Sequence, residues 1–206
     1  QARAFAEFLV QVCPVLGITD WFEEVPIRTS GDKVQDVRLA DIGGKGLFAK
    51  EIHEALLEGR IDCAVHSLKD LETQLPFGVV LACVLAREDA RDVLILGPGC
   101  GTPSVEQPWD ALPEGAVVGT SSLRRQAQLL HARPDLRVVL LRGNVQTRLA
   151  KLAAGACDAT MLARAGLRRL GQEDAAGVVL DPLVMLPAAG QGIIGVTVRA
   201  ADQELV

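Results

Sequence analysis

The sequence contains no tyrosine and few aromatic residues of any kind. Only five phenylalanines and two tryptophans occur among 206 residues, whereas 49% of the residues are apolar. The core must therefore be aliphatic, which is typical of parallel strands covered by helices. No apolar run reaches the roughly 18 residues that a membrane-spanning helix needs, so we expect no membrane segment. An apolar content this high also excludes a disordered chain.

Cysteine and histidine are too scattered to indicate a metal site, and we predict none. The five cysteines form no CxxC pair, and the three histidines lie far apart in the sequence. An odd number of cysteines without metal-binding spacing is typical of reduced thiols, so we expect a cytoplasmic protein. No signal or transit peptide is recognisable. His53 falls in a predicted helix and His131 near the end of another, and we expect both at the surface.

The negative net charge conceals one strongly basic segment. The chain has a formal charge of −5, yet residues 120–170 contain nine arginines and one lysine against two aspartates. An acidic protein with one basic segment is not expected to bind nucleic acid in general. The pattern indicates a small anionic ligand instead, and arginine favours planar, bidentate contacts with carboxylates.

Strand-like and helix-like segments alternate along the chain, which predicts the α/β class. A short strand is expected over 25–29, and the apolar spacing after the glycines at 43–46 predicts a helix that ends near Glu58. The remaining predicted strands occupy 61–65, 79–85, 93–96, 116–119, 137–141, 157–162 and 193–198.

Two crossover segments divide these strands between two lobes. The polar segment 87–91 interrupts the strand pattern once. A segment rich in proline and glycine around Gln191 interrupts it again. We therefore expect two lobes joined by a double hinge, with a ligand cleft between them. The predicted division is 1–86 plus 193–206 for the first domain, 91–186 for the second, and 87–90 and 187–192 for the hinges.

Hydroxyl, amide and guanidinium groups gather where three of the predicted strands end. Such groups cap helices and attract anions to the helix amino terminus, and the carboxyl ends of neighbouring parallel strands face one crevice. The pattern therefore predicts a carboxylate or phosphate site, and the alternative is a set of plain helix caps with solvated arginines. The residues concerned are Thr120, Ser121, Ser122, Arg124, Arg125, Arg142, Asn144, Arg148, Arg164, Arg168 and Arg169.

In the first lobe, the segment 66–70 follows a predicted buried strand. Its Asp70 would be the one carboxylate near a cationic cleft, able to stabilise a positive charge that develops on a substrate. From the residues alone, a surface pair of Lys69 and Asp70 in a turn is the simpler interpretation. The Gly-Gly-Lys-Gly string at 43–46 resembles a phosphate loop but lacks the Walker spacing.

Seven short motifs, taken together, resemble the hydroxymethylbilane synthase family, also called porphobilinogen deaminase. They are GGKGLF at 43–48, HSLKD at 66–70, RED at 87–89 with RD at 91–92, VGTSSLRR at 118–125, LRGN at 141–144 with TRL at 147–149, AGL at 165–167 and GQG at 190–192. Their order and spacing extend the resemblance over essentially the whole chain. It implies two lobes with the fold of type II periplasmic binding proteins, joined by a double crossover hinge.

The resemblance also implies an activity. The family condenses four porphobilinogen molecules head to tail, with loss of ammonia, into hydroxymethylbilane in the tetrapyrrole (heme) pathway. Growth begins on a dipyrromethane primer, the cofactor, which is attached to a cysteine of a third domain. The resemblance implies a monomer that acts on a small-molecule substrate.

Individual residues acquire roles by the same resemblance. Asp70 would be the catalytic carboxylate, Lys45 would lie on a loop over the cleft, and Gln191 would belong to the hinge. The expected primer-binding residues are Ser67, Lys69, Thr120, Ser121, Ser122, Arg124, Arg125 and Gly166. The expected substrate-binding residues are Arg142, Gly143, Asn144, Arg148 and Arg169.

The sequence departs from the family pattern in several places. The family's first strand and its third domain, with the primer cysteine, are not among these 206 residues. We therefore expect the 206 residues alone to be inactive. Asp41 replaces a basic or neutral residue, Glu72 replaces a proline, and Arg164 replaces a small or apolar residue. Two alternatives stay open: a non-catalytic solute-binding module for a small carboxylate, and a truncated relative without activity.

Overall fold

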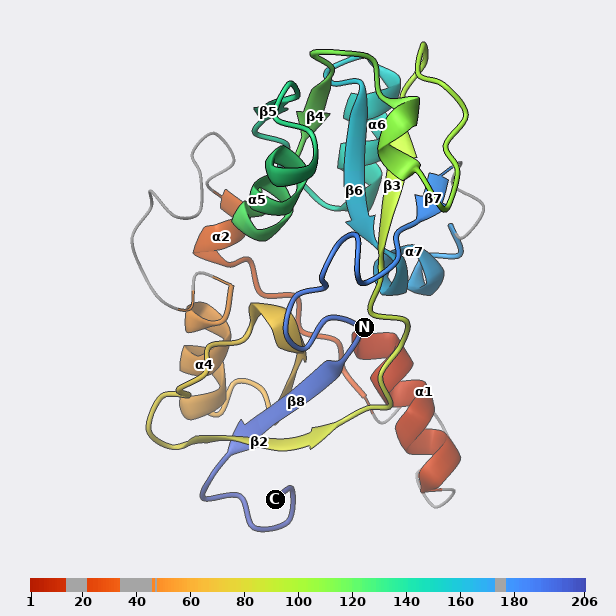
Figure 1. Ribbon diagram of the computed structural model, residues 1–206. Coiled ribbons are helices and arrows are strands. Elements are labelled where there is room, and N and C mark those ends of the chain that lie inside the picture. Colours follow the sequence, from red (N-terminus) through yellow and green to blue (C-terminus); the bar gives the residue numbers. More distant parts are fainter. Residues whose placement is uncertain (14–21, 34–45, 47, 173–176) are drawn as a thin grey trace. The chain divides into compact units, whose positions relative to one another are not determined.

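The computed structural model describes residues 1–13, 22–33, 46, 48–172 and 177–206, and these form two compact units (Figure 1). Unit 1 contains the described residues up to Arg87 together with Ile193–Val206, and unit 2 contains those of Glu88–Gly192. Among the described residues, the chain passes between the units after Arg87 and after Gly192. The hinge role of 87–90 and 187–192 stays a prediction.

Unit 1 is built on an antiparallel sheet in which β8 lies between β1 and β2. Helix α4 covers this sheet, and its Leu56 packs against Ala64 and Val79 in a small buried cluster. The strands are β1 (Cys63–Ser67), β2 (Val79–Val84) and β8 (Ile194–Arg199). The helices are α1 (Ala2–Val12), α2 (Ser30–Lys33), α4 (Lys50–Leu57) and the 3₁₀ turn η3 (Leu68–Asp70).

Two expectations for unit 1 need correction. Residues 22–29 form no strand, since Pro26 removes a backbone donor from the second position of the segment that was expected to pair. The helix expected after residue 43 begins, among the described residues, only at Lys50. Positions 43–45 and 47 lie outside the described residues, and so do Asp41 and Lys45.

Unit 2 contains a five-stranded sheet in the order β5-β4-β6-β3-β7. β4 runs parallel to β5 and β6, whereas β3 runs antiparallel to β6 and β7. The first strand after the crossover is thus inserted beside the last two, which is the lobe topology of type II periplasmic binding proteins. The strands are β3 (Asp92–Leu96), β4 (Val117–Gly119), β5 (Arg137–Val139), β6 (Ala159–Ala163) and β7 (Gly177–Val179).

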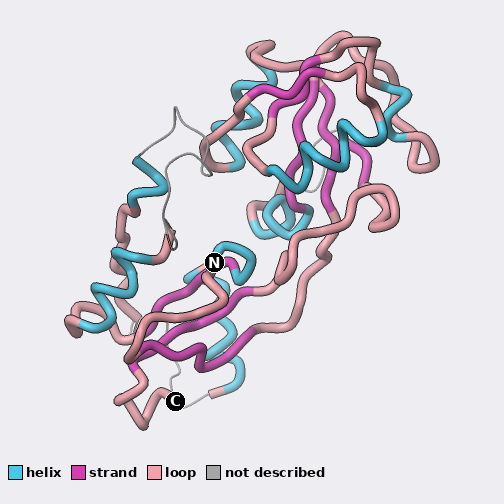
Figure 2. The backbone as a smooth tube through the Cα atoms, turned by 60° about the vertical axis from the view of Figure 1, so that its left-hand side comes forward, coloured by secondary structure: helices cyan, strands magenta, loops and turns pink. Residues whose placement is uncertain are grey.

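Helices cover both faces of this sheet (Figure 2). Successive side chains of a strand point to opposite faces, and β3 shows the consequence. Its Leu94 joins the buried cluster under α5, while its Val93 and Ile95 join the cluster under α6 and α7. The helices are η4 (Pro108–Ala111), α5 (Leu123–Ala132), α6 (Val145–Ala153) and α7 (Arg164–Arg169). Every helix in the described part of the chain is too short or too polar to cross a membrane.

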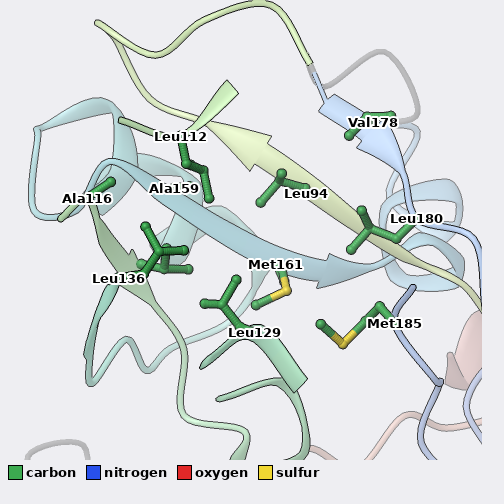
Figure 3. Close-up of a cluster of buried hydrophobic side chains, with 11 residues drawn as sticks. Leu94, Leu112, Ala116, Leu129, Leu136, Ala159, Met161, Val178, Leu180 and Met185 are labelled. Atoms are coloured by element: carbon green, nitrogen blue, oxygen red, sulfur yellow. The ribbon is translucent and has the colours of Figure 1, made fainter. Parts of the chain in front are cut away.

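The α5 side of the sheet provides a test of this core. Leu129 is fully buried beside Met161 and Met185 (Figure 3), whereas Leu123 on the same helix is 57% exposed. Leu129→Ala is expected to lower the free energy of unfolding by about 2–5 kcal/mol because it leaves a cavity. Leu123→Ala should change it by less than about 0.5 kcal/mol. Denaturant titration of both variants measures the difference, and equal effects would contradict the assigned core.

Candidate functional site

Three parallel strands of unit 2 end at one edge of the sheet. β4 ends at Gly119 and lies between β5, which ends at Val139, and β6, which ends at Ala163. Each of these strands is followed by a helix. The topology therefore brings together the three strand-to-helix junctions that carry most of the predicted ligand-binding residues.

The first junction is closely packed. A Cβ added to Gly119 would lie 2.8 Å from Cys157 Sγ, so only glycine lets β4 approach its neighbours here. Thr120 is buried, its N–H donates to Val139 O (2.9 Å), and its Oγ1 accepts from the Ser122 N–H (3.1 Å). The Thr120 side chain thus shapes the turn that leads into α5.

The amino end of α5 is capped by Ser122, whose Oγ accepts from the Arg125 N–H at 3.4 Å. The neighbouring Ser121 is half-buried, and its hydroxyl makes no hydrogen bond to any described residue. A helix amino terminus carries a partial positive charge and unpaired N–H groups. This junction therefore has the chemistry of an anion site.

The two arginines in the first turn of α5 share a buried carboxylate. Arg125 donates from Nη2 to Asp92 Oδ1 (2.8 Å) and from Nε to Oδ2 (3.2 Å), while Arg124 donates from Nη2 to Oδ2 (2.8 Å). Burial raises the pKa of Asp92, but the charges of Arg125 and Arg124 outweigh it and hold the pKa below its ordinary value. Sequence reasoning missed Asp92, which was assigned only to a motif.

The second junction leads into α6. Asn144 caps the helix, since its Oδ1 accepts from both the N–H and the hydroxyl of Thr147, each at 2.8 Å. Gly143 has a φ of 120°, a conformation that favours glycine. Its carbonyl oxygen accepts from Arg148 Nε at 2.7 Å. Arg142 is 5% exposed and Arg148 is half-buried, so neither side chain of this junction extends fully into solvent.

The third junction leads into α7, and its three arginines bond to the two crossover segments. The pairs are Arg164 Nη1 with Asp89 Oδ2 (2.7 Å), Arg168 Nη1 with Glu88 Oε1 (2.8 Å) and Arg169 Nη2 with Gly192 O (2.7 Å). Burial lowers the pKa of Arg169, against the opposing effect of the Glu88 charge. At Gly166, among the described residues, an added Cβ would make an ordinary van der Waals contact with Val145 Cγ2 at 3.9 Å.

Gln191 connects the two crossover segments within unit 2. It is 1% exposed, and its Nε2 donates to Ala90 O (2.7 Å) and to Asp92 Oδ1 (2.8 Å). The predicted hinge residue therefore bonds to the same carboxylate as Arg124 and Arg125.

In unit 1, strand β1 leads directly into the predicted catalytic segment. Ser67 is its last residue and its Oγ accepts from Gln1 Nε2, and Lys69 and Asp70 lie in the turn η3. The Leu68 N–H donates to Ile193 O at 3.0 Å, which fixes the turn to the sheet. Asp70 is exposed, so a short anchored turn presents its carboxylate at the surface of this unit.

The expectation that His53 lies at the surface was wrong. Its side chain is 4% exposed, with Nδ1 3.5 Å from Glu72 Oε1 and the ring 5.7 Å from that of His66. The helical spacing allowed either face, and packing of α4 on the sheet turned this one inward. His66 Nε2 lies 2.9 Å from Thr197 Oγ1. Burial, and then the charge of His53, lowers the pKa of His66 to about 4.

The buried His66 predicts a specific dependence of stability on pH. Its pKa of about 4 in the folded chain lies below the ordinary value near 6.5, so the unfolded chain binds more protons between these values. The stabilisation is present above about pH 6.5 and is lost as the pH falls towards 4. His66→Gln is expected to remove about 3 kcal/mol of this pH dependence.

Denaturant unfolding at a series of pH values measures the effect. His131 is exposed, so His131→Gln is the matched control and should leave the pH dependence unchanged. A pH dependence that is the same in His66→Gln as in the parent protein would show that the assignment is wrong.

The fold and these junctions define a class: a two-unit α/β protein of the type II binding-protein topology, with a basic edge where parallel strands end. The family model "Porphobilinogen deaminase, dipyromethane cofactor binding domain" matches residues 1–206. The chain belongs to the porphobilinogen deaminase family.

Curated relatives are similar over most of this chain. Porphobilinogen deaminase of Caulobacter sp. (strain K31) is 56% identical over 88% of the chain and 55% of its own length. That of Sorangium cellulosum (strain So ce56) is 50% identical over 100% of the chain and 65% of its own length. The chloroplastic porphobilinogen deaminase of Oryza sativa subsp. japonica is 54% identical over 89% of the chain and 49% of its own length. The chain thus spans about half to two thirds of the length of these relatives.

Proposed function

We propose that the protein acts as a hydroxymethylbilane synthase, which condenses four porphobilinogen molecules head to tail with loss of ammonia. The observation that carries this proposal is the set of capped helix termini and arginines at one sheet edge, in a chain of this family. The cytoplasmic location, the monomeric state and the inactivity of the isolated 206 residues are parts of the same proposal.

The residues at the α5 junction fit the family's dipyrromethane cofactor. Each of its two pyrroles carries an acetate and a propionate, so the group presents four carboxylates. Ser121 has a hydroxyl without a described partner, and Arg124 is 23% exposed on its side chain with N–H groups to spare. When bound, the cofactor supplies the pyrrole carbon to which the first porphobilinogen is joined.

The α6 and α7 junctions are suited to the substrate and the growing chain. Arg142 and Arg148 lie at the junction that Asn144 caps, and arginine binds carboxylates in a planar, bidentate manner. Gly166 has no side chain of its own, so a ligand can approach the backbone of α7 closely at this position. Because each added pyrrole brings two more negative charges, an edge with several arginines suits a ligand that grows.

The role of Asp70 follows from charge. Loss of ammonia from porphobilinogen leaves positive charge on the aminomethyl carbon and the pyrrole ring. Two unit charges 4 Å apart interact by about 4 kcal/mol at an effective dielectric constant near 20. A carboxylate on a short, anchored turn is therefore suited to stabilise the positive charge that develops as the amino group leaves.

Replacement of Asp70 tests this function. In the full-length protein, Asp70→Asn is expected to lower hydroxymethylbilane production by at least about 10²-fold, because the neutral amide cannot stabilise the developing charge. Binding of porphobilinogen should persist. Turnover and calorimetric binding are measured side by side.

Glu54 is an exposed carboxylate of the same unit, so Glu54→Gln is the matched control and should keep full turnover. Undiminished turnover in Asp70→Asn would refute the catalytic role. A full-length parent protein that binds a small carboxylate without releasing ammonia would instead support the solute-binding alternative.

A further inference from the structure

Unit 2 buries a carboxylate directly beneath the arginines of its α5 junction. Asp92 is the first residue of β3 and is fully buried. Four hydrogen bonds reach it from the side chains of Arg124, Arg125 and Gln191, at 2.8 to 3.2 Å. A buried carboxylate is tolerated only when it is paired and hydrogen-bonded in this way.

The charges of this cluster do not cancel. Two guanidiniums surround one carboxylate, so a single positive charge remains at the amino end of α5. The Ser122 cap and the helix dipole add to the positive potential at the same place. The cluster is therefore both a buried ion pair and a source of attraction for an anion.

The two arginines differ in how many of their N–H groups are available to a ligand. The Arg125 side chain is 6% exposed, and besides its bonds to Asp92 it donates from Nη1 to Met161 O at 2.8 Å. Arg124 is 23% exposed on its side chain. It uses one N–H on Asp92 and one on Leu186 O (2.5 Å), so three of the five N–H groups of its guanidinium bond to no other residue in the described part of the chain.

Gln191 fixes the carboxylate from the other side. Its Nε2 donates to Asp92 Oδ1 and also to Ala90 O, two residues before Asp92. The carboxylate therefore has little freedom to rotate, and the guanidinium that bonds to its second oxygen is held with it. Placement of a binding group by neighbouring hydrogen bonds is a common way to pre-organise a site.

We propose that Asp92 is a positioning residue for Arg124: clamped by Arg125 and Gln191, its carboxylate holds the Arg124 guanidinium in place for a carboxylate of the bound dipyrromethane. In this arrangement Arg124 contacts the ligand, and Arg125 and Gln191 act on it through Asp92. The inference rests on the proposed function, since it takes the ligand to be a pyrrole carboxylate.

A double-mutant cycle tests the coupling between Asp92 and Arg124. Binding of a free dipyrromethane that carries acetate and propionate groups is measured by calorimetry in the full-length protein with Asp70→Asn, prepared without its covalent cofactor so that the α5 junction is accessible. Asp92→Asn and Arg124→Gln are each expected to weaken binding by about tenfold, which corresponds to about 1.4 kcal/mol. The double variant should bind no more weakly than Arg124→Gln alone, because Asp92 acts only through Arg124.

A merely structural role gives a different result. If Asp92 only stabilises the fold, its substitution either leaves binding unchanged or adds its full effect to that of Arg124→Gln, and both outcomes overturn the proposal. So does normal binding by Arg124→Gln. Asp135 pairs with Arg133 beyond the other end of α5, so Asp135→Asn is the matched control and should leave binding unchanged.

Two further variants keep the test decisive if Asp92→Asn does not fold. Asp92→Asn combined with Arg125→Met removes the buried charges together, which is often tolerated. Gln191→Met removes only a neutral donor. Each of these variants is combined with Arg124→Gln in the same cycle. The proposal requires that the combination binds the ligand no more weakly than Arg124→Gln alone. Failure of the proposed function is recognised separately, because the full-length parent protein, with Asp70 in place, would then release no ammonia from porphobilinogen, whatever the cycle gives.

Discussion

The carboxylate of Asp92 is buried where the chain enters unit 2, and much of that unit is arranged around it. A lone charge at this depth would be costly, so the chain must bring cations to it. Arg124 and Arg125 come from the start of α5, and Gln191 comes from the segment that leaves the unit. One electrostatic requirement thus ties the first strand, a helix terminus and both crossover segments together.

The parallel arrangement of β4, β5 and β6 imposes a second constraint. Because each of these strands is followed by a helix, three helix amino termini arrive at one edge of the sheet. Each terminus needs a cap, and Ser122 and Asn144 supply two of them. The same groups that complete the helices therefore leave the edge polar and positively charged, so the site is largely a by-product of how the fold satisfies its own backbone.

Local signals made much of this predictable. The three strand-to-helix units and the caps follow from patterns that span only a few residues. The partners of Asp92 lie about 30 and 100 residues away in sequence, so no local pattern could connect them. His53 was misplaced for a related reason: helical spacing shows that a face exists but not what covers it. Pro26 is the local signal against a strand over 25–29, since a proline inside a strand removes a ladder donor.

Arg164 shows how a departure from the family pattern is accommodated. A long cation at the start of α7 would repel Arg168 and Arg169, which follow on the same helix. Asp89 accepts a hydrogen bond from Arg164 Nη1 and also pairs with Arg91. The guanidinium is thereby drawn to the crossover segment within unit 2, and its charge is partly offset by a carboxylate that it shares with Arg91. A substitution that looks disruptive from the sequence is thus offset by an acidic residue that already belongs to the motif at 87–89.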